Sequence, residues 1–130
     1  MWWDGDLSRE LLDDTKIDKW VPSSLSTTRL LTAYNYGAAS NNSTKATPVI
    51  SADIFGDWRE EVVWRTSDNT ALLLFTSPYT TTYRIPTLMH DPQYRVQVAG
   101  QNMGYNQPPH PSFFLGNGMG AVTLPAIRTP

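Results

Sequence analysis

Two short acidic stretches repeat each other 51 residues apart, and this repeat constrains the fold more than any other feature. Trp2–Leu11 aligns without gaps on Asp53–Val62. Three positions are identical in the two copies: Gly5 and Gly56, Asp6 and Asp57, and Glu10 and Glu61. Self-similarity at a period near fifty residues is typical of repeated β units, with propeller blades as the leading candidate. The sequence therefore predicts an all-β fold made of β-propeller blades.

Each acidic stretch has the composition of a loop that folds around a hard cation. Ca²⁺ takes roughly 6–8 oxygen ligands, and a glycine allows the sharp turn that such a loop needs. Clustered carboxylates repel one another unless a cation or an arginine lies among them. We therefore predict Ca²⁺ as a cofactor, with the ligands Asp53, Asp57 and Glu61 in the second copy and Asp4, Asp6 and Glu10 in the first. The alternative for the second copy is a turn in which Arg59 pairs with Glu60 or Asp57.

The length of the chain indicates an incomplete propeller. The 130 residues hold fewer than three units of the repeat, whereas propellers close with roughly 4–8 blades. The net charge of −2 gives no reason to expect nucleic acid or an acidic membrane as a partner. The chain has no cysteine for disulfides, and its first residues do not have the pattern of a signal peptide.

Local patterns predict short strands and one helix. Asp91-Pro92 predicts a helix over residues 93–102, with Asp91 as the N-cap and proline at the first position. The spacing of Tyr94, Val96 and Val98 instead favours a strand there, and we prefer the helix. The tryptophans Trp2, Trp3, Trp58 and Trp64 are predicted to belong to the core rather than to stack on sugars. Strands are predicted over residues 17–20, 28–34, 49–52, 60–66, 71–75, 83–85 and 112–115.

Four longer motifs occur in one order along the chain. They are Trp2-Trp3-Asp4-Gly5-Asp6-Leu7, Phe55-Gly56-Asp57-Trp58-Arg59-Glu60-Glu61, Thr87-Leu88-Met89-His90-Asp91-Pro92-Gln93-Tyr94-Arg95 and Tyr105-Asn106-Gln107-Pro108-Pro109-His110-Pro111-Ser112-Phe113. Together they closely resemble the C-terminal part of rhamnogalacturonan lyases of polysaccharide lyase family 11. The resemblance extends from Trp2 to about Gly116.

This resemblance implies a fold, a reaction and a setting. The fold would be the C-terminal blades of an eight-bladed β-propeller over residues 1–116, followed by a tail over residues 117–130. The reaction would be calcium-dependent β-elimination in the rhamnogalacturonan I backbone of pectin by a secreted enzyme. Open sheet edges would be covered by the further blades or by a second copy of the chain. No nucleic acid or membrane partner is expected.

The resemblance also implies where the chemistry lies. The segment Asn42-Ser43-Thr44-Lys45 resembles an Asn-Gly-Thr-Lys segment that lines the family's cleft, so Asn42, Ser43 and Thr44 would bind sugar and Lys45 would be the base. A lysine near cations and away from water can lose its proton near neutral pH. Asn102 and Tyr105 resemble further substrate contacts. Without the resemblance, Lys45 would be a solvated charge, and Asn102 and Tyr105 would be a turn residue and part of the core edge.

Two other functions compete with a lyase. One is a non-catalytic carbohydrate-binding or structural module with calcium-stabilised loops, and the other is an adhesion-type calcium propeller. The combination of Lys45 with Asn42, Asn102 and Tyr105 favours the lyase, whereas the short length favours a non-catalytic module. Since family catalysis draws on residues of earlier blades, we expect the 130-residue chain alone to have little or no lyase activity.

Overall fold

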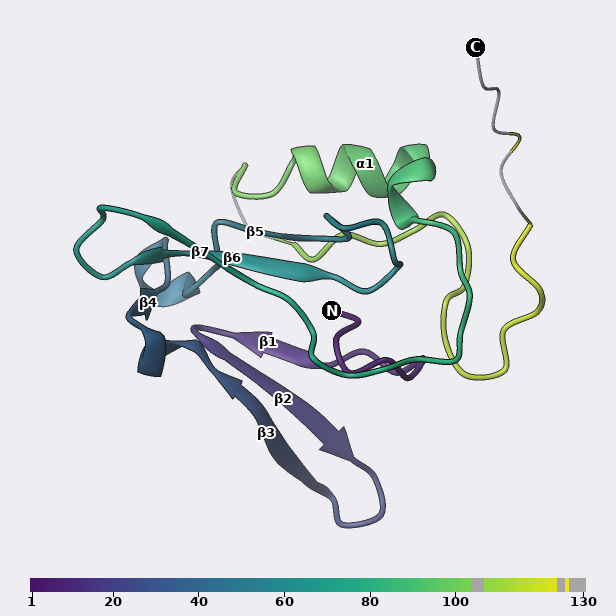
Figure 1. Ribbon diagram of the computed structural model, residues 1–130, viewed down its shortest axis with the longest axis horizontal. Coiled ribbons are helices and arrows are strands. Elements are labelled where there is room, and N and C mark those ends of the chain that lie inside the picture. Colours follow the sequence, from purple (N-terminus) through teal and green to yellow (C-terminus); the bar gives the residue numbers. More distant parts are fainter. Residues whose placement is uncertain (104–106, 124–125, 127–130) are drawn as a thin grey trace.

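Two antiparallel sheets and one helix make up the fold (Figure 1). The computed structural model describes residues 1–103, 107–123 and 126. The first sheet has the order β1 (Leu11–Asp13), β2 (Lys16–Val21) and β3 (Ser26–Thr32). The second contains β4 (Ala38–Ala39), β5 (Ile50–Ala52), β6 (Glu61–Thr66) and β7 (Leu72–Phe75). The helix α1 spans Pro92–Ala99, and short 3-10 turns span Ala33–Tyr36, Ser43–Lys45 and Leu88–His90.

Strand β6 is the centre of the second sheet because it pairs along both edges. Val62 and Val63 pair with β5 on one side and with β7 on the other, and Arg65 pairs with both β4 and β7. Its β-branched and aromatic residues suit a buried strand. Val62 and Trp64 are fully buried, as expected for alternate residues that face one side of a sheet.

Two apolar clusters form the core. The first lies between the sheets and contains Trp3 and Trp64, whereas the second contains Trp2, Trp58 and Tyr94. Trp2 and Trp3 enter different clusters because successive residues of an extended chain point to opposite faces. The prediction that the four tryptophans belong to the core is confirmed, since each is at most 3% exposed.

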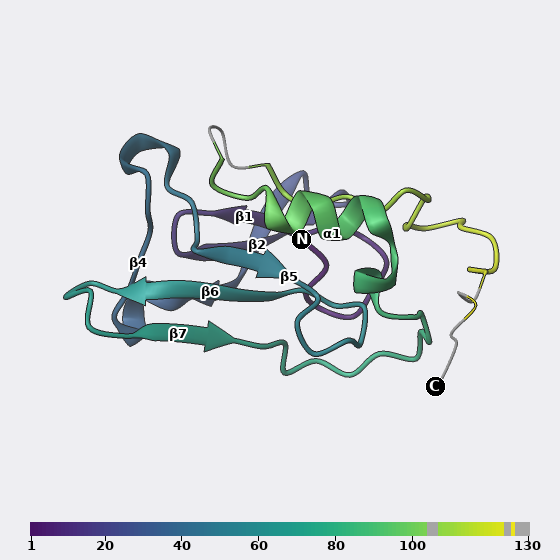
Figure 2. The ribbon, with the colours of Figure 1, turned by 90° about the horizontal axis from the view of Figure 1, so that it is seen from above.

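The predicted helix is confirmed as α1. The Asp91 side chain accepts a hydrogen bond from the Gln93 amide, and Pro92 occupies the first turn. Tyr94 is buried, whereas Val96 is 71% exposed, so the alternation at period two was not the signal of a strand. The helix lies beside β5 in both views (Figure 1 and Figure 2). Residues 83–85 and 112–115, predicted as strands, form none.

The prediction of propeller blades is wrong, although the β class is confirmed. The two sheets have three and four strands, and neither closes into a barrel. The repeat covers only a loop and the strand that leaves it. After the first copy the chain makes the β2–β3 hairpin, whereas after the second it adds one strand and then continues without regular strands to α1. Within the described part of the chain, no helix has the length and apolar character to cross a membrane.

Candidate functional site

The two acidic loops share one hydrogen-bonding scheme at the spacing of 51 residues. In the first loop, Glu10 Oε2 accepts from the Trp3 amide at 2.6 Å. In the second, Glu61 Oε2 accepts from the Ile54 amide at 2.9 Å. The middle aspartate accepts from the amide two residues later in both, and the glycine has a positive φ of 93° in the first loop and 78° in the second. The sequence repeat is therefore also a repeat of geometry.

The first loop gathers the carboxylates of Asp4, Asp6 and Glu10. One oxygen from each lies within 4.8 Å of the others, and hard oxygen donors of this kind suit Ca²⁺. However, Lys19 Nζ lies among them, at 2.7, 2.6 and 3.0 Å from Asp4, Asp6 and Glu10. An ammonium group therefore already fills the position that a metal ion would need.

The charges of the first loop shift one another's pKa values. Burial alone would lower the pKa of Lys19, but its hydrogen bonds to the three carboxylates raise it above its usual range. Burial alone would raise the pKa of Asp6, yet the hydrogen bond from Lys19 leaves it below the ordinary value. Glu10 is more deeply buried, and burial raises its pKa despite the same lysine. Lys19 thus stays charged at neutral pH.

The second loop does not gather its carboxylates in the same way. Asp57 pairs with Arg59, whose Nε donates to it at 3.1 Å, as the alternative interpretation of the sequence proposed. Asp53 Oδ2 accepts from the Thr87 hydroxyl at 2.7 Å and from the Leu88 amide at 2.8 Å. Its other oxygen is buried and has no hydrogen-bond partner in the described part of the chain.

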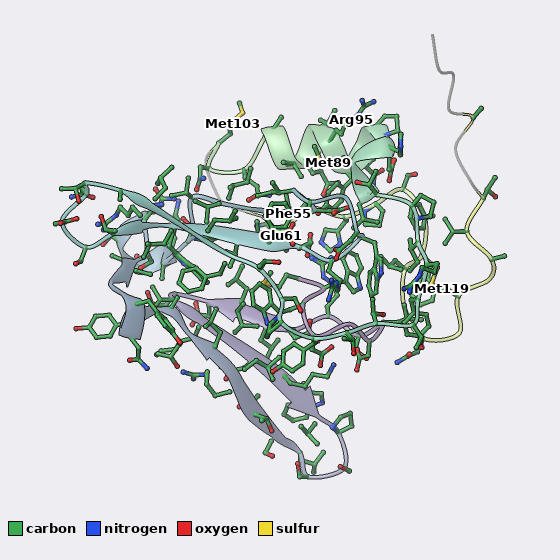
Figure 3. All side chains as sticks on the ribbon, in the orientation of Figure 1. Phe55, Glu61, Met89, Arg95, Met103 and Met119 are labelled. Atoms are coloured by element: carbon green, nitrogen blue, oxygen red, sulfur yellow. The ribbon has the colours of Figure 1, made fainter. Side chains whose placement is uncertain are left out.

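Glu61 completes the second loop from the first residue of β6. Figure 3 shows it next to Phe55, whose amide donates to Glu61 Oε2 at 3.0 Å. Burial raises the pKa of Glu61, although these amide hydrogen bonds act in the opposite direction. In the described residues, Asp53, Asp57 and Glu61 do not form a group of converging oxygens. A metal ion at this loop stays a prediction.

The predicted catalytic loop, Asn42 to Lys45, is a 3-10 turn with an unusual backbone. Asn42, Ser43 and Ala46 all have a positive φ, between 47° and 60°. A left-handed conformation costs a residue with a side chain about 1–2 kcal/mol, and glycine avoids this cost. Ser43 therefore bears a backbone strain that a glycine at this position would not have. Thr44 and Lys45 are exposed.

An amide and hydroxyl network joins this loop to the end of α1. Asn42 Nδ2 donates to Thr47 Oγ1 at 2.7 Å and to Asn102 Oδ1 at 3.1 Å. The Thr47 hydroxyl donates to the same Asn102 oxygen at 3.3 Å, and Asn102 Nδ2 donates to the Val49 carbonyl at 2.6 Å. Two predicted sugar-binding residues, 60 positions apart, are thus brought together. Tyr105 lies outside the described residues.

Thr47 and Arg9 are site residues that the sequence analysis missed. Lys45, Thr47, Arg9 and His110 line a shared cavity of about 620 Å³. The Arg9 guanidinium lies 4.3 Å above the Trp2 ring and donates to the Pro109 carbonyl and, at 2.9 Å, to His110 Nδ1. Burial and then the charge of Arg9 lower the pKa of His110. No local pattern marks the contacts of Arg9 with Pro109 and His110, because these partners are about a hundred residues away.

Comparison with known families identifies the chain. A family model described as the C-terminal domain of rhamnogalacturonan lyase family 11 matches residues 1–125. The chain belongs to rhamnogalacturonan lyase family 11. The resemblance found in the four sequence motifs is therefore confirmed, and the match places this family 11 chain in the C-terminal part of such enzymes.

Relatives of this family 11 chain are much longer than the chain itself. The rhamnogalacturonan endolyase YesW of Bacillus subtilis (strain 168) is 56% identical over 130 residues, which are 100% of this chain and 21% of the relative. The rhamnogalacturonan exolyase YesX of the same organism is 49% identical, over 98% of this chain and 22% of the relative. The chain thus spans about a fifth of the length of these curated relatives.

The fold of the family 11 chain matches a solved structure of a relative. The crystal structure of rhamnogalacturonan lyase YesW superimposes with a TM-score of 0.92 at 56% identity, covering 99% of this chain and 22% of that one. The structural neighbour is thus the C-terminal domain of a family 11 lyase. This finding, together with the open sheets, replaces the description of the chain as propeller blades.

Proposed function

We propose that this chain is the C-terminal domain of a rhamnogalacturonan lyase and supplies one side of its catalytic cleft. The supporting observation is the network that joins Asn42 and Asn102 through Thr47, because Thr47 lines the same cavity as Lys45 and Arg9. Amide groups held in this way can bind sugar hydroxyls through both their oxygen and their nitrogen. The cationic side chains of Arg9 and Lys45 suit a polymer that carries galacturonate carboxylates.

In the proposed reaction, Lys45 takes the proton from C5 of galacturonate, the electrons of the C5–H bond form a double bond between C4 and C5, and the oxygen at C4 leaves with the electrons of the C4–O bond. Asn42, Ser43, Thr44, Asn102 and Tyr105 would hold the sugar so that C5 lies within reach of the base. Ca²⁺ bound to the substrate carboxylate would stabilise the negative charge that develops there. The enzyme would act outside the cell, where pectin is found.

A domain exchange tests the role of Lys45. The C-terminal domain of YesW would be replaced by this chain, which it matches at 56% identity over the full 130 residues. The exchanged enzyme is expected to cleave rhamnogalacturonan I. Cleavage would be monitored by the ultraviolet absorbance of the unsaturated uronate that forms. Lys45→Met should abolish cleavage, whereas Lys16→Met, at another exposed lysine, should leave it unchanged. Full activity of the Lys45→Met enzyme would contradict the proposal.

The same assay addresses the second candidate, a non-catalytic carbohydrate-binding or structural module. It is favoured by the observation that carboxylates of both acidic loops already form hydrogen bonds and ion pairs within the chain. We expect the 130-residue chain alone to release little or no unsaturated product with or without added Ca²⁺. Rapid product formation by the isolated chain would refute this expectation. A non-catalytic module would instead give an active exchanged enzyme that tolerates Lys45→Met.

A further inference from the structure

We propose that Lys19 is a built-in cation that replaces a divalent metal ion in the first acidic loop. Its ammonium group lies within 3.0 Å of a carboxylate oxygen of each of Asp4, Asp6 and Glu10. The Glu10 side chain is completely buried, and those of Lys19 and Asp4 are each 18% exposed. Carboxylates held this close together and partly out of water need a positive charge among them.

The second loop shows which position Lys19 occupies in the repeated unit. In the first unit, Leu11 pairs with Asp18, and Lys19 is the next residue of β2. In the second unit, Val62 pairs with Phe75, and Thr76 is the next residue. Thr76 is therefore the structural counterpart of Lys19, although it does not lie 51 residues away in the sequence.

The two counterparts make the same contact with the repeated glutamate. Lys19 Nζ donates to Glu10 Oε1 at 3.0 Å, and Thr76 Oγ1 donates to Glu61 Oε1 at 3.4 Å. A neutral hydroxyl is sufficient in the second loop, where Arg59 neutralises Asp57. The first loop has serine at the position of that arginine, and it has a carboxylate, Asp4, where the second loop has Phe55. The aspartates of the two loops are thus paired with cations from different positions: Arg59 pairs with Asp57 in the second loop, and Lys19 of β2 pairs with Asp4 and Asp6 in the first.

This arrangement leaves the first loop without a vacancy for Ca²⁺. A divalent ion would have to displace the ammonium group, and a lysine left beside the metal would repel it. Removing the charge of Lys19 should therefore convert the loop into a calcium site made of three carboxylates.

Calcium titration of four chains tests the proposal: the natural chain, Lys19→Met, Asp4→Asn, and the control Lys16→Met. Lys16 lies in the same strand but is exposed. Binding would be measured by calorimetry, and the melting temperature would be recorded in chelator and in calcium chloride. Lys19→Met should melt at a lower temperature in chelator, regain stability with calcium, and bind calcium at least about tenfold more tightly than the natural chain.

The natural chain and Lys16→Met should show no calcium binding that depends on Asp4. Asp4→Asn provides this comparison without any change at Lys19, so the test holds even if Lys19→Met folds only in calcium. Calcium bound by the natural chain and lost in Asp4→Asn would overturn the proposal. A folded Lys19→Met chain that gains no calcium binding would overturn it as well.

Discussion

Thr47 is the residue through which Asn42 and Asn102 are held together. It is 8% exposed, accepts from the amide of Asn42 and donates to the oxygen of Asn102. Both asparagines have left-handed backbones, at φ values of 60° and 68°. The hydroxyl therefore fixes two side chains whose backbones are already unusual, and it acts on the site by positioning them.

Thr47→Val is expected to loosen this network while preserving the shape of the side chain. Loss of the hydroxyl should lower the free energy of unfolding by about 1–2 kcal/mol, because an amide donor loses its buried partner. Binding of rhamnogalacturonan oligosaccharides, followed by NMR, should weaken. Thr47→Ser keeps the hydroxyl and serves as the control. Unchanged binding and stability in Thr47→Val would show that the threonine does not position the asparagines.

The position of each missed residue explains why the sequence did not reveal it. Thr47 bonds to a residue 55 positions away, and Lys19 reaches the acidic loop only because β2 folds back beside β1. Such contacts depend on strand register, and no local spacing encodes them. By contrast, the glycines of the acidic loops could be identified directly as turn residues, because glycine adopts a positive φ without steric cost.

At the scale of elements, the sequence correctly predicted those strands and helix ends that depend mainly on neighbouring residues. Strand β6 follows from its β-branched and aromatic run, and the start of α1 follows from Asp91 and Pro92. Residues 112–115 are similarly apolar, yet they form no strand. A strand needs a partner as well as propensity. The prediction of propeller blades was wrong for the same reason. The repeat specifies a loop and a strand, but it does not specify which strand pairs with that strand.

The cap of α1 also attaches the helix to the segment that follows it. Asp91 accepts from the Gln93 amide at 3.1 Å with one oxygen and from the Ser112 amide with the other. Asp91→Ala should lower the free energy of unfolding by about 1–2 kcal/mol, the usual cost of a lost N-cap, as measured by urea denaturation. Asp91→Asn keeps a capping oxygen and should cost less. Equal stability of Asp91→Ala and the natural chain would argue against the cap.

For the whole molecule, Glu60 connects three separate segments. Its side chain is fully buried, and it accepts from the Trp2 amide at 2.9 Å and from the Tyr94 hydroxyl at 2.7 Å. The same hydroxyl accepts from the Asp53 amide at 3.0 Å. Burial and the nearby charge of Glu60 raise the pKa of Tyr94, which therefore remains a donor. One carboxylate thus joins the N-terminal segment, the second acidic loop and α1.

Glu60→Leu is expected to lower the free energy of unfolding by about 3 kcal/mol or more, because it leaves the Trp2 amide and the Tyr94 hydroxyl buried without acceptors. Glu60→Gln keeps one acceptor and should cost less. The free energy of unfolding of both variants would be measured by thermal and urea denaturation, monitored through the fluorescence of the buried tryptophans. A Glu60→Leu chain as stable as the natural one would mean that this carboxylate does not link the segments.

The contact of Arg9 with Pro109 and His110 has a consequence for how the chain reaches its native state. It closes a loop of about a hundred residues, and contacts between distant residues slow folding because chain entropy is lost before they form. During synthesis, the residues around Arg9 leave the ribosome long before their partners. The first acidic loop can therefore complete its native environment only late, when most of the chain has emerged.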